Sequence, residues 1–318
     1  MSSSDSVHIM GGHTAGRILV DGGQTGMRLR IETPGGSDDR ELGPIRTDRP
    51  VVEQIGEAVG DAGIPQGTWS LAAGVSGLTP QAARSSALLA AVADLGVTAV
   101  ALAHDSVTAY LAANRDGFGV VTAVGTGVVT LGVGPAGVHR VDGWGYLFGD
   151  AGSAYWIGRA GISAALRAFD GRGSETILQQ RAAEVFGPLD ELYMVIQGDP
   201  DRVARVAGFA RAVDAAAQAG DDVAQRVIDG AADELAESAV TALERSGHRP
   251  GDDARISWMG TVMSASARLR RRFVDVVGER VPGVDIGAPH GQPLDGVRLL
   301  TDLGDAHPLA AEVHRSNL

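Results

Sequence analysis

Two aspartates stand where an apolar run ends, and both suit the chemistry of phosphoryl transfer. Asp21 closes the apolar part of RILVDGG, and Asp105 closes that of TAVALAHDS. A carboxylate there binds Mg²⁺ through water or accepts the proton of a substrate hydroxyl. We expect Asp21 to bind the metal and Asp105 to be the base, with His104 as the alternative base. The simpler interpretations are a turn residue and a helix N-cap.

Two glycine-rich bends could hold the phosphates. ILVDGGQTGMRLRI and TAVGTGVVTLGVG share one plan, an apolar strand, a bend with glycine and threonine, and a second apolar strand. Glycine leaves its backbone N–H unobstructed, and successive N–H groups with a threonine hydroxyl form an anion-binding nest. Ordinary tight hairpins also use glycine, which is the alternative. The residues expected to bind phosphate are Gly22, Gly23 and Thr25 in the first bend and Gly125, Thr126 and Gly127 in the second.

The segment VDGWGYLFGDAGSAYWIGRAGI crowds glycine, aromatic and acidic residues before a helix. Aromatic faces and carboxylates suit a sugar, because the ring stacks on apolar surface while the hydroxyls pair with carboxylate oxygens. We expect Gly143 and Asp150 to bind sugar hydroxyls. Trp144 is a candidate for stacking, with packing as its alternative, and packing is the favoured role of Trp156.

Strands and helices must position these residues, and their alternation in both halves indicates an α/β fold. The first half is rich in strands, with helices expected at 51–64 and 80–96 and from Asp105 onward. The second half is mostly helical, with a late strand and loop at 254–262. The shared plan of the two glycine bends suggests two related lobes. Expected helices of the second half are Ser153–Phe169, Glu175–Val185, Pro188–Gln197, Val203–Ala219, Asp222–Ser246 and a terminal helix in HPLAAEVHRSNL.

Composition limits the partners. The 318-residue chain has a net charge of −12, so an acidic surface would repel nucleic acids and anionic membranes. It holds no apolar run long enough to span a bilayer, and its start, MSSSDSVHIMGGHTAG, lacks the basic and apolar regions of a secretory signal. We therefore expect no nucleic-acid or membrane partner and a flexible leader over residues 1–16.

Two residue types are missing, which excludes several kinds of chemistry. Without cysteine there are no disulfides, thiolate nucleophiles, zinc–thiolate sites or iron–sulfur clusters. All 27 basic residues are arginine, so Schiff-base chemistry, the P-loop lysine and the strand lysine of protein kinases are also absent. Any ATP must be bound by a different architecture.

The motifs together resemble a known family. DGGQT, HDS, GTG, DGWGYLFGDAGSAYWIG and VAGFARAVDAAAQAGD occur in the order typical of N-acetylglucosamine kinases of the BadF/BadG/BcrA/BcrD superfamily. The resemblance covers about residues 17–300 and implies two RNase H-like (actin-like ATPase) lobes around a central cleft. It implies a first lobe at 17–107, completed by a C-terminal helix at about 300–318, and a second lobe at 108–299 with a helical insertion.

The resemblance also implies an ATP-dependent kinase of an amino sugar, with Mg²⁺ as the metal, in a cytoplasmic homodimer. Asp105 matches the catalytic base, and the two glycine bends match the phosphate loops. The adenosine side would involve Ala207, Gly208, Gly260 and Thr261. Sugar contacts would come from Ser76, Asp105, Gly143, Trp144 and Asp150.

Some positions depart from the family pattern. Gln24 and Met27 replace a glycine and a threonine of the first phosphate loop, Ala151 replaces a glutamate, and Val128 a serine. These changes keep open a sugar or nucleotide sensor with weakened catalysis on the same fold. The activator ATPases and the ROK family carry functional cysteines. This chain has no cysteine and therefore does not match either group. A DNA-binding repressor would need a helix-turn-helix and a basic face.

Overall fold

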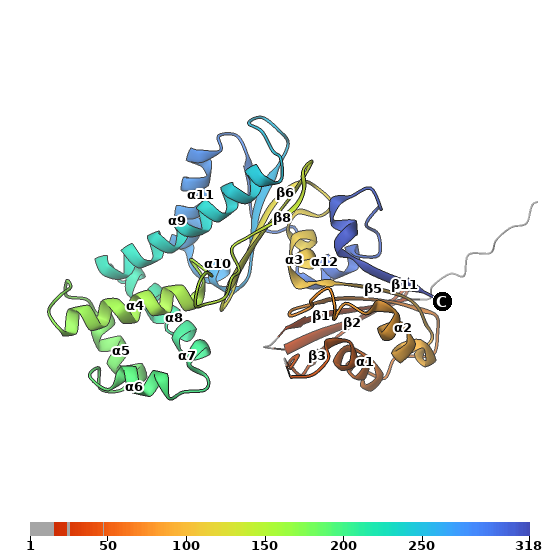
Figure 1. Cartoon of the computed structure of the whole chain (residues 1–318), viewed down its shortest axis with the longest axis horizontal. Coiled ribbons are helices and arrows are strands. Elements are labelled where there is room, and N and C mark those ends of the chain that lie inside the picture. The colour runs from red at the N-terminus through yellow and green to blue at the C-terminus, as the bar shows by residue number, and fades with distance from the viewer. Residues whose placement is uncertain (1–15, 24–25, 47) are drawn as a thin grey trace, which may run out of the picture. The chain divides into compact units, whose positions relative to one another are not determined.

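The computed structural model describes residues 16–23, 26–46 and 48–318. They form two compact units (Figure 1). Unit 1 contains the described residues up to Thr108, together with Pro293–Asp302 and Ala311–Leu318. Unit 2 contains Ala109–Gln292 and Leu303–Ala310. Each unit has its own mixed sheet, which confirms the α/β class predicted from the sequence.

Unit 1 is built on a six-stranded sheet in the order β11-β5-β4-β1-β2-β3. Strands β1, β2 and β3 form an antiparallel meander, and β1, β4 and β5 run parallel. Parallel neighbours need crossover connections, which helices α1 and α2 provide. The strands are β1 (Gly16–Gly23), β2 (Gly26–Thr33), β3 (Gly36–Leu42), β4 (Trp69–Val75), β5 (Val97–His104) and β11 (His314–Asn317), and the helices are α1 (Val51–Asp61), α2 (Ser85–Val92) and the 3₁₀ turn η1 (Ala93–Leu95).

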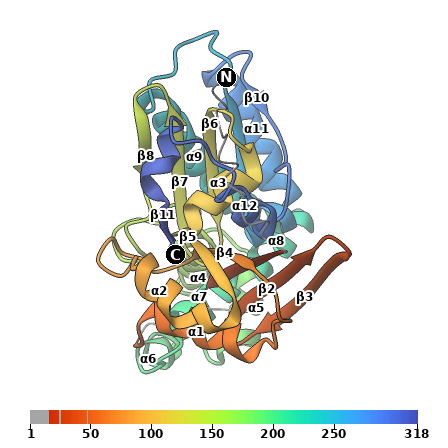
Figure 2. The same cartoon turned by 90° about the vertical axis from the view of Figure 1, so that its right-hand side faces the viewer.

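Alternation along β1 divides its side chains between the two faces of the sheet. Ile18 and Val20 are fully buried in the core beneath α1 and α2, which cover one face (Figure 2). Because side chains alternate in a strand, Arg17 and Asp21 point to the other face. Asp21 therefore lies at the carboxyl end of β1, on the face away from α1 and α2.

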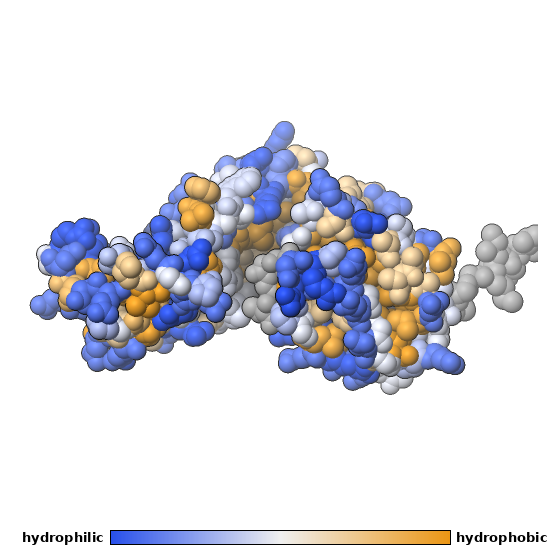
Figure 3. Space-filling model, turned by 60° about the horizontal axis from the view of Figure 1, so that its bottom comes forward, coloured by the Kyte–Doolittle hydropathy of each residue, from blue (hydrophilic) through white to orange (hydrophobic). Residues whose placement is uncertain are grey.

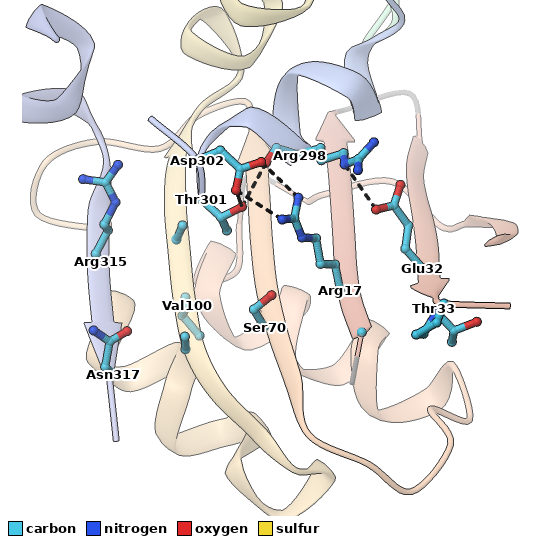
Figure 4. Close-up of a pocket in the computed structure, with 14 residues that line it drawn as sticks. Arg17, Glu32, Thr33, Ser70, Val100, Arg298, Thr301, Asp302, Arg315 and Asn317 are labelled. Carbon is cyan, nitrogen blue, oxygen red and sulfur yellow. Dashed lines mark hydrogen bonds and ion pairs between the residues drawn. The ribbon is translucent and has the colours of Figure 1, made fainter. Parts of the chain in front are cut away.

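Helix α12 (Pro293–Leu299) and the residues that follow it lie on this second face. Ion pairs join them to β1 and β2. Asp302 accepts two hydrogen bonds from Arg17 at 3.1 and 3.2 Å, and Arg298 lies 3.5 Å from Glu32 (Figure 4). These pairs border a hollow of about 610 Å³ over the amino-terminal ends of the parallel strands β1 and β4. All four side chains are partly exposed, so each pair adds little stability on its own.

The predicted C-terminal helix at about 300–318 is wrong. The segment instead forms a short 3₁₀ turn, η2 (Pro308–Glu312), followed by β11, which pairs antiparallel with β5. Only four residues form β11, too few for a clear apolar period. The edge of β5 offers its backbone N–H and C=O groups as hydrogen-bond partners to β11. This pairing cannot be read from the sequence of the segment itself.

Unit 2 is built on a five-stranded sheet in the order β10-β9-β6-β7-β8. Strands β6, β7 and β8 form an antiparallel meander, and β9 runs parallel to β6, as β4 does to β1 in unit 1. This repeated topology supports the inference of two related lobes. The strands are β6 (Gly119–Val124), β7 (Val128–Gly134), β8 (Gly137–Val141), β9 (Arg255–Met259) and β10 (Asp285–Ile286).

Helices pack against the sheet of unit 2 and against one another. The long helix α9 packs on β6, β7 and β8, and a Cβ on Gly132 would lie 2.4 Å from the carbonyl oxygen of Ala242. The expected helix at Val203–Ala219 is two helices, which meet at Phe209. The helices are α4 (Ala154–Phe169), α5 (Leu178–Phe186), α6 (Leu192–Gln197), α7 (Arg202–Gly208), α8 (Ala210–Gln218), α9 (Asp222–Arg245), α10 (Thr261–Ala265) and α11 (Ala267–Arg280), and α3 (Asp105–Asn114) joins the two units in sequence.

On the face drawn in Figure 3, hydrophilic residues are interspersed with apolar patches. Tyr193 and Met194 on α6 are among the exposed large apolar side chains. In the part of the chain that the structure describes, no helix combines the length and apolar character needed to cross a bilayer.

Candidate active site

Asp21 and Asp105 line one pocket in unit 1, of about 380 Å³. Asp21 is near the end of β1, and Asp105 follows β5 directly and begins α3. The carboxyl ends of parallel strands meet at one edge of a sheet, which is where α/β proteins bind ligands. The structure therefore places the expected metal ligand and the expected base at the same pocket, and their roles stay predictions.

The pocket concentrates negative charge. Burial and, next, the charge of Asp105 raise the pKa of Asp21 to about 6, while Arg28 opposes the rise. A raised carboxyl pKa means that the folded protein disfavours the ionised form, which a bound cation would stabilise. Carboxylate oxygens are the ligands that Mg²⁺ prefers, and it commonly keeps several waters beside one or two of them. The Asp21 carboxylate, with the negative charge of Asp105 nearby, thus fits a hydrated Mg²⁺. Among the described residues, no cluster of three or more metal-ligating side chains was found.

His104, the alternative base, contacts Asp105 itself. Its Nδ1 lies 2.9 Å from Oδ1 of Asp105 and 2.9 Å from Oγ of Ser106. The imidazole is therefore positioned to orient the carboxylate, and any change to His104 acts on Asp105 as well. The Asp105 side chain is 40% exposed, so a substrate can reach it.

The first glycine bend is held by close packing. Gly22 accepts a hydrogen bond from the backbone N–H of Ser76 at 2.9 Å. A Cβ on Gly22 would lie 2.8 Å from Cδ1 of Ile45, so a larger residue would disturb the end of β1. A Cβ on Gly23 would lie 3.5 Å from Oγ of Ser76. Both glycines line the pocket with Asp21, whereas the expected phosphate ligand Thr25 lies outside the described residues.

The second glycine bend lies against the start of α4. Gly125 donates to the carbonyl of Gly127 at 2.8 Å, and the carbonyls of Gly125 and Thr126 accept from the backbone N–H groups of Ala154 and Tyr155. The N–H of Gly125 is thus used within the turn. In the part of the chain that the structure describes, the N–H groups of Thr126 and Gly127 donate to no residue, so these two remain candidates for binding phosphate.

The second bend is also joined to the expected sugar loop. Asp150 is buried, and its carboxylate accepts hydrogen bonds from the backbone N–H groups of Gly145 and Val128. Burial raises the pKa of Asp150. A Cβ on Gly127 would lie only 2.6 Å from Oδ2 of Asp150. The structure therefore brings together two residues that the sequence assigned to different ligands.

This close approach gives a test. In Gly127→Ala the new methyl group would displace the Asp150 carboxylate, and we expect the KM for sugar to rise about tenfold or more with little change in Tm. Gly125→Ala is the matched control, because a Cβ there meets nothing closer than 4.0 Å. Steady-state kinetics measures both. Equal sugar KM values for the two variants would show that Asp150 does not contact the sugar.

Asp142 is a residue that the sequence analysis missed. Its carboxylate accepts backbone hydrogen bonds from Gly143 at 2.7 Å, Asp150 at 2.9 Å and Ala151 at 2.8 Å. Both Asp142 and Asp150 have a φ of 57°, a left-handed conformation that aspartate tolerates better than most residues. An aspartate directly before the Gly143–Trp144 pair was the available signal. Asp142 holds the two ends of the loop together.

Replacing Asp142 tests this role. Asp142→Ala removes three acceptor bonds, each worth about 1 kcal/mol, so the loop should lose its order. We expect the sugar KM to rise about tenfold while ATP binding changes little. Asp170→Ala, which removes a surface carboxylate paired with Arg172, is the control. An unchanged sugar KM in Asp142→Ala would contradict the assignment.

The same loop exposes the predicted aromatic residue. Trp144 is 72% exposed, and the guanidinium of Arg140 lies 5.9 Å from the centre of its ring. Arg140 also donates to the carbonyl oxygen of Gly143, where φ is 76°. Packing, the alternative interpretation for Trp144, does not describe this exposed ring, which is available to stack on a ligand.

An apolar pocket of about 340 Å³ in unit 2 contains part of the expected adenosine side. Ala207 and Thr261 line it, whereas Gly208 and Gly260 do not. Gly260 has a structural reason to be glycine, since its φ is 97° and a Cβ would lie 2.2 Å from the carbonyl of Val124. Polar residues that the sequence analysis missed also line this pocket, namely Arg211, Asp214, Gln218 and Ser266.

Comparisons with known proteins show what the chain is similar to. The model of the BadF/BadG/BcrA/BcrD ATPase family matches residues 11–297. An N-acetylmuramic acid/N-acetylglucosamine kinase of Clostridium acetobutylicum is 35% identical over 120 residues, 37% of this chain and 39% of the relative. An N-acetyl-D-glucosamine kinase of Dictyostelium discoideum is 27% identical over 203 residues, 62% of this chain and 64% of the relative. Each match thus spans less than two thirds of the relative.

Solved structures share the fold. One from Chromobacterium violaceum, named as a candidate N-acetylglucosamine kinase, superposes with a TM-score of 0.68 at 23% identity. The alignment covers 90% of this chain and 99% of that one. At this identity the match establishes the fold, which is the two-lobed α/β fold expected from the sequence.

Proposed function

The chain belongs to the BadF/BadG/BcrA/BcrD ATPase family, and from this premise we propose that it is an ATP-dependent kinase of an amino sugar. N-acetylglucosamine is the first candidate substrate, because both curated relatives are named for it. The observation that carries the proposal is the Asp21–Asp105 pocket. It combines a partly buried carboxylate suited to a metal with a more accessible carboxylate suited to a proton.

In the proposed reaction, Asp105 accepts the proton of the sugar hydroxyl as its oxygen attacks the γ-phosphorus of ATP. The bond between that phosphorus and the bridging oxygen breaks, and the electron pair leaves with ADP. Asp21 would hold Mg²⁺, which neutralises phosphate charge when bound. Other residues of this chain would bind and orient the two substrates.

Unit 2 contains further residues that we propose to bind the substrates. Thr126 and Gly127 offer N–H groups to phosphate, and the apolar pocket at Ala207 and Thr261 suits an adenine ring. Asp150, with Gly143 and Trp144 on the same loop, would bind the sugar. Ser76 of unit 1 is a further proposed sugar contact. We include a cytoplasmic homodimer in the proposal, for which the molar mass by light scattering is the check.

A sugar or nucleotide sensor is the second candidate function. Ala151 and Gln24 stand where the resemblance expects a glutamate and a glycine. In the described structure, however, the backbone N–H of Ala151 is held by Asp142, so the loop is ordered without that glutamate. The chain keeps the carboxylates of Asp21, Asp105 and Asp150, and their retention favours the kinase over the sensor.

The test is ADP release with Mg·ATP against a panel of hexoses and amino sugars, with sugar binding measured separately by calorimetry. The kinase predicts sugar-dependent ADP release on at least one amino sugar. Sugar binding without ADP release would establish the sensor instead. Reverting Ala151→Glu would then ask whether the lost side chain is the cause.

A further inference from the structure

Arg28 occupies a distinctive place in the Asp21 pocket. The strand register sets Asp21, Arg28 and Glu41 side by side on β1, β2 and β3. Residues directly opposite one another in neighbouring strands point to the same face. All three line the pocket of about 380 Å³ together with Asp105. Arg28 therefore supplies the positive charge in a pocket that three carboxylates line.

Arg28 differs from the other arginines of this meander. Arg30 makes two hydrogen bonds to Asp39, at 2.6 and 2.8 Å, and Arg40 binds Asp38. In contrast, the Arg28 guanidinium makes no hydrogen bond or ion pair with any residue that the structure describes. It acts on Asp21 by charge alone, lowering the pKa of that carboxyl. An exposed arginine without a partner, beside carboxylates, has its donors available to a ligand.

The negative charge of the pocket gives the available donors of Arg28 their importance. A nucleotide polyphosphate approaching Asp21, Asp105 and Glu41 would be repelled unless cations offset those carboxylates. The chain has no lysine to do so. A guanidinium is always charged and binds phosphate oxygens through two parallel N–H donors.

We propose that Arg28 is a catalytic residue that binds the terminal phosphates of the nucleotide, beside the position where Asp21 would hold Mg²⁺. This inference rests on the proposed function, because it takes the nucleotide as the ligand of the pocket. Arg28 then offsets the charge that accumulates on the transferred phosphoryl group, as cations do in phosphoryl transfer.

The test compares Arg28→Gln, Arg28→Lys and the control Arg40→Gln in the full chain. Arg40 lies on the neighbouring strand, is paired with Asp38 and does not line the pocket. Calorimetry with ADP and Mg²⁺ in the absence of sugar measures binding, and steady-state kinetics separates kcat from the two KM values. Tm checks folding.

For Arg28→Gln we expect Mg·ADP affinity to fall about tenfold or more and kcat to fall further, with sugar KM unchanged. Arg28→Lys should recover part of the affinity because it restores the charge but not the paired donors. Arg40→Gln should match the wild type. If Arg28 only stabilised the fold, Arg28→Gln would lower Tm. It would then not raise the ATP KM selectively over the sugar KM.

Two outcomes would overturn the inference, and they can be told apart from failure of the proposed function. Wild-type Mg·ADP affinity in Arg28→Gln rejects the role of Arg28 alone. Absence of Mg·ADP binding to the wild type rejects both. If the wild type binds Mg·ADP but phosphorylates no sugar, the kinase proposal fails, and the loss of affinity in Arg28→Gln still supports Arg28 as a phosphate ligand.

Discussion

Asp105→Asn is expected to lower kcat by about a hundredfold to ten-thousandfold, the range typical of losing a general base. The amide keeps nearly the shape of the carboxylate but cannot accept the hydroxyl proton. Binding of sugar and of Mg·ADP should change much less, because the hydrogen-bonding contacts of the side chain largely remain. Kinetics and calorimetry on the same preparation measure both effects.

His104→Gln is the control for this variant. His104 contacts Asp105 at 2.9 Å, so its loss should disturb the orientation of the base and lower kcat by a smaller factor. A larger loss in His104→Gln than in Asp105→Asn would make His104 the base. Near-normal kcat in Asp105→Asn would remove Asp105 from the mechanism.

Asp21→Asn is expected to make the protein more stable and inactive. Burial raises the pKa of Asp21 from 3.8 to about 6, so near neutral pH the folded state holds a carboxylate that it disfavours. One pKa unit corresponds to about 1.4 kcal/mol, which gives a penalty of up to about 3 kcal/mol. The neutral amide removes the penalty and also removes the proposed Mg²⁺ ligand.

The direction of the Asp21 pKa shift determines how the stability gain of Asp21→Asn depends on pH. With a raised pKa in the folded state, the contribution of Asp21 to stability is full below about pH 4 and is lost as pH rises through about 6. Asp21→Asn should therefore exceed the wild type in free energy of unfolding near neutral pH and match it below about pH 4.

Denaturant unfolding without Mg²⁺ or nucleotide measures the stability gain, and calorimetry measures the expected loss of Mg·ADP binding. The control is Asp39→Asn, whose carboxyl is exposed and has a pKa lowered by Arg30. That variant should gain no stability. A less stable Asp21→Asn at neutral pH would contradict the electrostatic account, and unchanged Mg·ADP binding would contradict the metal role.

Much of unit 1 could be predicted, because apolar runs in its sequence correspond to buried strands in its structure. The buried apolar runs of β1 and β5 end at Val20 and Ala103, shortly before Asp21 and Asp105, and the parallel arrangement then places these two side chains at one edge. Strand β3 gave no such signal, because GSDDREL is rich in charged residues and is mostly exposed. The position of β3 depends on its pairing with β2, which cannot be read from the sequence of β3 alone.

The less predictable parts of the site depend on contacts between distant segments. Gly127 and Asp150 meet only because the second bend lies against the start of α4. The role of Asp142 depends on three backbone N–H groups that converge when the loop folds back. Arg28 could be recognised only once the register set it between Asp21 and Glu41. Sequence spacing alone shows none of these relations.

The most direct measurement is transfer of the phosphoryl group itself. Wild-type protein and Asp105→Asn are incubated with N-acetylglucosamine, Mg²⁺ and ATP that is radiolabelled at its γ-phosphate, and the products are separated. The account predicts a labelled sugar phosphate from the wild type and little from the variant. Label remaining in ATP, or appearing only as inorganic phosphate, with N-acetylglucosamine and every other amino sugar would contradict it.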